Sequence, residues 1–190
     1  MSADPRGYRR YVIEAKARGE KLDVNLVQFA TRYRFAGQLQ RIELLGASRE
    51  TEETYLMALR IALAYSALEQ LEVFLGKKHI PIKSAECASV FRSQGLSRFR
   101  EFLKETSDKS LKNRIEKLHK SRGDQDVRPL IEALRHTMFH GRFNPSATSL
   151  RNKAGRKFLN DLEHALFARL DYIADLAFAA QRQPKIDPNW

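Results

Sequence analysis

Cysteine, glycine and proline are scarce in this chain of 190 residues, which contains one, nine and six of them. The single cysteine, Cys87, excludes an internal disulfide, and the five histidines are too dispersed to favour a zinc site. The chain must therefore fold on its hydrophobic core, and its length suits one domain, or one domain with an extension. A chain without disulfides fits a reducing, cytoplasmic setting.

Uninterrupted apolar segments are also missing. The most apolar stretch, residues 56–75, contains Arg60, Glu69 and Glu72, so we expect a buried helix of a soluble protein rather than a membrane span. The first ten residues are charged and lack an apolar centre, so no signal peptide is expected. No membrane partner is therefore predicted.

Acidic residues are missing from residues 135–157, which contain six lysines and arginines. Residues 92–122 are also basic, with ten lysines and arginines against four acids. Each segment has a net charge of +6, whereas the whole chain has +11, so the rest of the chain is close to neutral. This concentration favours a polyanionic partner, most often nucleic acid, over charge that serves only solubility.

Helical periodicity runs along nearly the whole chain, and no alternating pattern typical of strands occurs. The spacing of apolar residues and of glycine and proline predicts helices over 5–18, 24–45, 48–75, 84–92, 96–105, 109–121, 126–140 and 150–182. The third helix and the last two carry strong apolar faces. We therefore predict an all-α fold, an antiparallel helical bundle.

The domain organisation follows from these helices. The bundle is expected to span residues 49–182, with a basic insertion around 84–122. Residues 1–48 form an N-terminal helical extension, and residues 183–190, which contain two prolines, form a flexible tail.

Four helix ends have recognisable signals. Ser48 or Thr51 can cap the start of the long third helix, and Gly76 follows its end. Asp126 can cap the helix over 126–140, and Gly141 stops it. The most informative stretch of the chain therefore lies at a helix end.

This stretch, residues 134–141, reads LRHTMFHG. A guanidinium such as that of Arg135 binds a phosphate with two hydrogen bonds and stabilises developing negative charge. An imidazole such as that of His140 transfers protons near neutral pH. The five-residue spacing places the two side chains about 140° apart around a helix, where both can border one cleft, and His136 shares a face with His140. Such a site cleaves RNA without a metal or cofactor and leaves a 2′,3′-cyclic phosphate.

The spacing alone carries little weight, because Arg114 and His119 have it too. That pair lies in a charged run without a terminating glycine, so a solvated helix face is the favoured interpretation there. Arg135 and His140 differ by having His136 between them and Gly141 after them.

Several other residues have two interpretations. Glu69 and Ser66 can face the same cleft, although an exposed or capped polar side chain is favoured for each. His164 is expected on the flank of the last helix. Three aromatic residues that interleave with arginines can stack on bases, although core packing is favoured for most of them: Phe91, Phe99 and Phe102.

The stretch 134–141 resembles the signature of the HEPN superfamily, in which an arginine is followed by a polar residue and then by a histidine four to six positions after the arginine. The resemblance covers roughly residues 49–182 and implies a small α-helical bundle. Many members are metal-independent endoribonucleases of toxin–antitoxin systems, phage defence, CRISPR effectors and RNA processing. Members typically dimerise, so that two motifs form one composite cleft.

By position, the resemblance implies that Arg135 binds phosphate, that His140 is the general base or acid, and that His136 orients the pair or the phosphate. The chain departs from one toxin branch, which has a tyrosine two residues after the motif histidine for nucleotide attachment by its antitoxin. That position is Arg142 here. The basic residues that follow the motif are candidates for RNA binding: Arg142, Arg151, Lys153, Arg156 and Lys157.

The leading hypothesis is a homodimeric, metal-independent endoribonuclease with RNA as its partner, acting as a toxin or in phage defence, and controlled by an antitoxin or another regulatory partner. The first alternative is a non-catalytic RNA- or nucleotide-binding module that uses the same basic face. The second is a structural helical protein whose charge serves solubility.

Overall fold

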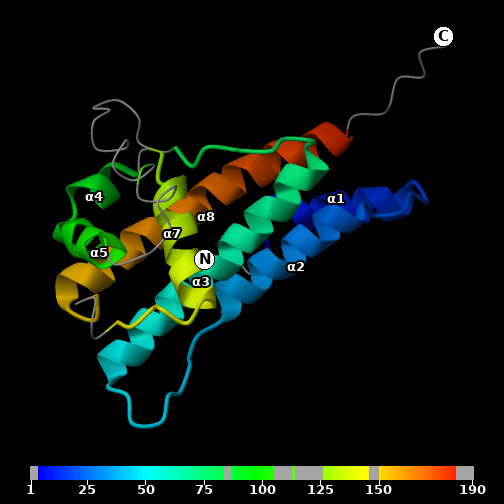
Figure 1. The fold of residues 1–190 in the computed structure, drawn as a ribbon. Coiled ribbons are helices and arrows are strands. Elements are labelled where there is room, and N and C mark those ends of the chain that lie inside the picture. The colour runs from blue at the N-terminus through cyan, green and yellow to red at the C-terminus, as the bar shows by residue number, and fades with distance from the viewer. Residues whose placement is uncertain (1–3, 84–86, 105–112, 114–125, 146–149, 183–190) are drawn as a thin grey trace.

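A computed structural model describes residues 4–83, 87–104, 113, 126–145 and 150–182. All regular structure in these residues is helical, which confirms the predicted all-α bundle (Figure 1). The helices are α1 (Tyr8–Ala17), α2 (Val24–Gln38), α3 (Arg49–Phe74), α4 (Cys87–Arg92), α5 (Gln94–Lys104), α7 (Arg128–Phe139) and α8 (Lys153–Arg182). In this part of the chain, no helix combines the length and apolar character that a membrane crossing requires.

The long helices pack in mixed directions, so the antiparallel arrangement predicted from sequence is observed only in part. α2 lies antiparallel to α3, whereas α8 runs in the same direction as α3 (Figure 1). Two ion pairs show that α3 and α8 are parallel. Glu53 of α3 contacts Arg156 of α8 at 3.6 Å, and about two turns later Arg60 of α3 contacts Glu163 of α8 at 2.6 Å. α7 lies across α3. The parallel pair arises because the segment between α3 and α8 returns the chain to the end where α3 begins.

The first two helices belong to the same hydrophobic core as the rest of the bundle. Phe29 of α2 is fully buried, and Tyr33 donates a hydrogen bond to Asp171 of α8 at 2.8 Å. Tyr11 of α1 stacks on Phe178 of α8, with 5.3 Å between ring centroids. The helices α1 and α2, which lie in the segment expected above to be an extension, therefore contribute to the common hydrophobic core.

Helix ends follow the sequence signals closely. Ser48 caps α3 by accepting a hydrogen bond from the backbone N–H of Thr51. Gly76 and Gly141 follow α3 and α7 with φ angles of 63° and 66°, the left-handed conformation that glycine favours. The N-cap of α7 is Val127, one residue after the Asp126 expected from sequence, although the Asp126 carboxylate accepts a hydrogen bond from the backbone N–H of Arg128 at 3.0 Å.

One helix end was placed wrongly by the sequence pattern. The helix expected over 24–45 ends at Gln38, and residues 39–47 form a loop in which Leu44 and Leu45 are exposed. These apolar residues have no neighbouring helix to pack against, and a helix depends on such packing for most of its stability.

The basic insertion agrees with the sequence where it is described. The helices expected over 84–92 and 96–105 are observed as α4 and α5. Phe99 is buried, with 5.4 Å between its ring centroid and that of Phe158, and Phe91 is partly buried against the core. Both positions agree with the core packing favoured from sequence. The helix expected over 109–121 and the tail at 183–190 lie outside the described residues, as does the side chain of Phe102.

Candidate functional site

The predicted catalytic residues lie together on one stripe of α7. Arg135, His136 and His140 line an open cleft of about 380 Å³ between α7 and α3. The lining residues from α7 are spaced as neighbours on one helix face, and two further lining residues come from α3. The full lining is Tyr65, Glu69, Glu132, Arg135, His136, Phe139 and His140.

Arg135 is held by both walls of the cleft. Its guanidinium forms an ion pair with the Glu69 carboxylate, and both side chains are about one-third exposed. Its guanidinium carbon lies 5.4 Å from the centroid of the Tyr65 ring and 5.9 Å from that of the Phe139 ring. Glu69 therefore faces the cleft, contrary to the exposed or capped position favoured from sequence. Ser66 does have a hydrogen-bond partner outside the cleft, because its hydroxyl accepts a hydrogen bond from Arg32 at 3.1 Å.

Tyr65 links Arg135 to the core. Its hydroxyl donates to Glu132 at 2.8 Å, and Glu132 also accepts from Arg128 at 2.9 Å. Burial raises the pKa of the Tyr65 hydroxyl, and the hydrogen bond to Glu132 raises it further. Tyr65 is therefore a neutral donor near physiological pH, and its ring supports the Arg135 side chain.

Arg128 has a structural role, although it also lies beside Tyr65, at 5.2 Å from the ring centroid. Its side chain is 5% exposed, forms an ion pair with Glu72, and donates to the carbonyl of Ile80 at 3.0 Å. Burial works against the charge of Arg128, but hydrogen bonds to Glu72 and Glu132 outweigh it and raise the pKa of the guanidinium. Arg128 thus anchors the start of α7 to the end of α3.

The two histidines lie at the other end of α7. Their ring centroids are 4.3 Å apart, and the His140 side chain is exposed at the last turn. Gly141 donates its backbone N–H to Met138 at 3.1 Å, and Arg142 donates its own to Thr137 at 2.9 Å. These two bonds make a Schellman motif, in which the positive φ of Gly141 turns the chain away from the helix axis. His140 is left at the mouth of the cleft.

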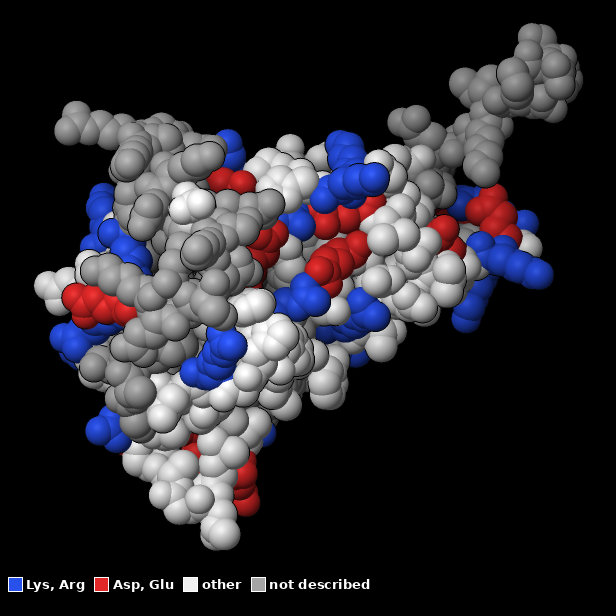
Figure 2. Space-filling model, in the orientation of Figure 1, with Lys and Arg blue, Asp and Glu red and all other residues white. Residues whose placement is uncertain are grey.

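The predicted RNA-binding cations do not line this cleft. Arg156 pairs with Glu53, which precedes Tyr65 on α3 by about 18 Å along the axis and lies about 120° around it. Lys157 pairs with Asp161 at 2.7 Å, while Arg151 and Lys153 are exposed near the start of α8. Arg142 is exposed just after Gly141. Figure 2 shows acidic side chains interleaved with basic ones across the middle of the face it presents.

The other histidines in the described part of the chain, His79 and His164, do not line the cleft. His164 is exposed on α8 and does not line the cleft, in line with the flank position expected from sequence. Arg114 and His119 lie outside the described residues.

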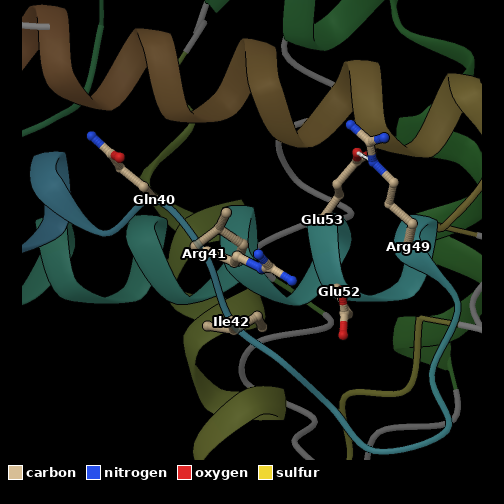
Figure 3. Close-up of a pocket in the computed structure, with 7 residues that line it drawn as sticks. Gln40, Arg41, Ile42, Arg49, Glu52 and Glu53 are labelled. Carbon is tan, nitrogen blue, oxygen red and sulfur yellow. Dashed lines mark hydrogen bonds and ion pairs between the residues drawn. The ribbon is translucent and has the colours of Figure 1, made fainter.

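A larger cavity of about 570 Å³ lies between the loop after α2 and the start of α3 (Figure 3). Its charged side chains are already paired. Arg49 donates to Glu53 at 3.0 Å, and Glu52 accepts from the backbone N–H of Leu44 at 2.9 Å. These contacts hold the loop against the start of α3, and the cavity has no set of reactive groups that point toward one another.

Sequence reasoning missed three lining residues, Tyr65, Glu132 and Phe139. Two of them had a readable signal, because Glu132 and Phe139 fall at helical spacing from Arg135, His136 and His140. Tyr65 had none, since its place opposite Arg135 depends on how α3 and α7 pack.

The described residues contain no group of three or more His, Cys, Asp or Glu side chains that could hold a metal ion. The chain matches no protein-family model, no curated protein and no solved structure. Its function is therefore inferred from the cleft and from the resemblance in residues 134–141.

Proposed function

We propose that this protein is a metal-independent endoribonuclease whose active site is the cleft between α3 and α7. The observation that carries the proposal is the meeting of Arg135, His136 and His140 on one wall of a single open cleft. A phosphate-binding cation beside an imidazole that can transfer protons suits cleavage by attack of a ribose 2′-hydroxyl.

In the proposed reaction, the guanidinium of Arg135 donates hydrogen bonds to the non-bridging oxygens of the scissile phosphate. The 2′-oxygen attacks phosphorus as an imidazole removes its proton, and the bond from phosphorus to the 5′-oxygen breaks as a protonated imidazole donates to that oxygen. His140, exposed at the cleft mouth, is the principal proton-transfer group, and His136 orients it through their 4.3 Å ring contact. The products are a 2′,3′-cyclic phosphate and a 5′-hydroxyl.

The HEPN resemblance extends this proposal to the assembly. Two copies bring their α7 ends to one composite cleft, so that the base and the acid can come from different chains. A toxin or phage-defence role in the cytoplasm, under an antitoxin or other regulatory partner, also follows from that resemblance alone. Arg142 disfavours control by nucleotide attachment, because it replaces the acceptor tyrosine.

A non-catalytic RNA- or nucleotide-binding module is the second candidate. The observation that favours it is the ion pair between Glu69 and Arg135, because a phosphate must compete with this carboxylate for the guanidinium. Binding without cleavage would result if the pair persists and keeps the phosphate away from His140.

Incubation of purified protein with mixed RNA in EDTA separates these candidates. We expect the wild type to cleave and His140→Ala to lose at least about 100-fold in rate, the scale of general acid–base catalysis. His164→Ala is the matched control and should cleave normally, because His164 is exposed on α8 away from the cleft. Equal cleavage by wild type and His140→Ala would refute the site.

If RNA binds at low salt and remains intact, the binding module is favoured. If RNA does not bind even at low salt, where phosphate contacts are strongest, both proposals fail and the charge serves solubility.

A further inference from the structure

We propose that Phe139 is a stacking platform for a nucleobase next to the phosphate held by Arg135, which selects single-stranded RNA. This inference rests on the proposed function for its ligand class.

Phe139 is placed where core packing does not explain it. Phe139 is 66% exposed, whereas Leu130, Ile131 and Leu134 of the same helix are buried. α7 therefore has one apolar face in the core and a large aromatic ring on the opposite side, at the edge of the cleft.

The position of the ring relative to Arg135 suits a nucleotide. Phe139 follows Arg135 by four residues, one turn along the same face, and its ring centroid is 5.9 Å from the guanidinium carbon. A phosphate bound to that guanidinium would bring a neighbouring base within reach of the ring. The guanidinium can thus bind the phosphate of a nucleotide while the aromatic ring stacks on its base.

Such a platform needs an unpaired base. Aromatic side chains stack on bases that are splayed out of loops and single strands, whereas bases inside a duplex are already stacked on one another. Stacking tolerates any base, so the platform would select strand state more than sequence. The α3 wall opposite supplies Tyr65 and Glu69. The Tyr65 residue is only 3% exposed and its ring lies against Arg135, so Phe139 is the exposed aromatic ring of the cleft.

Equilibrium binding of a labelled oligouridine to the His140→Ala protein tests the platform without cleavage. Adding Phe139→Ala should weaken binding by about 5- to 150-fold, the usual range for one stacked base. Adding Phe139→Trp should preserve binding, because the larger ring still stacks. Adding Phe35→Ala is the matched control, since Phe35 is 58% exposed on α2 and does not line the cleft.

An abasic scan locates the contact. One abasic nucleotide, moved along the oligouridine, should weaken binding at one position when Phe139 is present and have no effect there in the Phe139→Ala background. Equal loss in both backgrounds would overturn the proposal. So would a change from dimer to monomer on Phe139→Ala with binding per chain unchanged, because the ring would then contact a second copy.

The two proposals fail in different ways. RNA that binds through Phe139 but is never cut by the wild type refutes the nuclease and leaves the platform standing. RNA that the wild type cuts, but that binds equally well with and without Phe139, refutes the platform alone.

Discussion

At the residue scale, two identical side chains on the same helix differ in burial. Arg128 and Arg135 both lie on α7 and both contact the Tyr65 ring. Arg128 is 5% exposed and pairs with Glu72 in the core, whereas Arg135 is 33% exposed and pairs with Glu69 at the cleft. A buried, paired cation stabilises the fold, whereas a cation that is one-third exposed could exchange its carboxylate partner for a phosphate under the proposed function.

Replacing each arginine by alanine should separate these roles. Arg128→Ala leaves Glu72 buried without its partner, so we expect a loss of about 3–5 kcal/mol in the free energy of unfolding. Arg135→Ala should lose less than about 1 kcal/mol, because its ion pair is partly exposed. Urea unfolding of both variants checks the stabilities, and RNA cleavage checks the activity, which Arg135→Ala should abolish at nearly full stability. Similar stability losses for the two variants would contradict this division.

At the element scale, α7 is the helix whose sequence carries the most information. Helical periodicity places Leu134 in the core, so it also places Arg135 and His136 outside it. One wall of the cleft was therefore predictable from residues 126–141. The opposite wall was not, because the approach of Tyr65 and Glu69 depends on tertiary packing of α3 against α7.

The end of α7 gives a prediction of its own. Gly141→Ala forces a side chain into the left-handed region at a φ of 66°, which costs about 1–2 kcal/mol. Gly76→Ala is a matched control at the end of α3, with a φ of 63° and open space around the added Cβ atom in both cases. We expect similar losses of stability, measured by thermal unfolding, but loss of RNA cleavage only for Gly141→Ala, because it disturbs the turn that positions His140. Equal activity in both variants would show that this turn does not matter for the reaction.

At the scale of the whole molecule, the sequence predicted an all-helical bundle but not its connectivity in space. Apolar faces reveal that helices pack, and they do not reveal the direction in which they pack. The parallel pairing of α3 and α8 and the burial of Phe29 and Tyr33 beneath them could be seen only in the structure. The positions of the basic residues were also not predictable from sequence. The basic residues of 135–157 are continuous in sequence, but in the structure they divide between the cleft and the start of α8.

This division bears on how RNA would lie on the protein. The cleft itself combines one arginine and two histidines with the carboxylates of Glu69 and Glu132. Under the proposed function, long-range attraction by the net charge of +11 would bring RNA to the surface, and local recognition of the phosphate would rest on Arg135. Reactivity is thus expected to depend on a few contacts in the cleft more than on the overall charge.

The chemical nature of the product ends tests the central claim most directly. RNA cleaved in EDTA should end in a 2′,3′-cyclic phosphate, with a 5′-hydroxyl on the downstream fragment, and Arg135→Ala and His140→Ala should produce neither. Replacing the 2′-hydroxyl at the cut position by hydrogen should block cleavage there, because the nucleophile is gone. A 3′-hydroxyl paired with a 5′-phosphate, or cleavage at the 2′-deoxy position, would contradict attack by the 2′-hydroxyl in the cleft between α3 and α7.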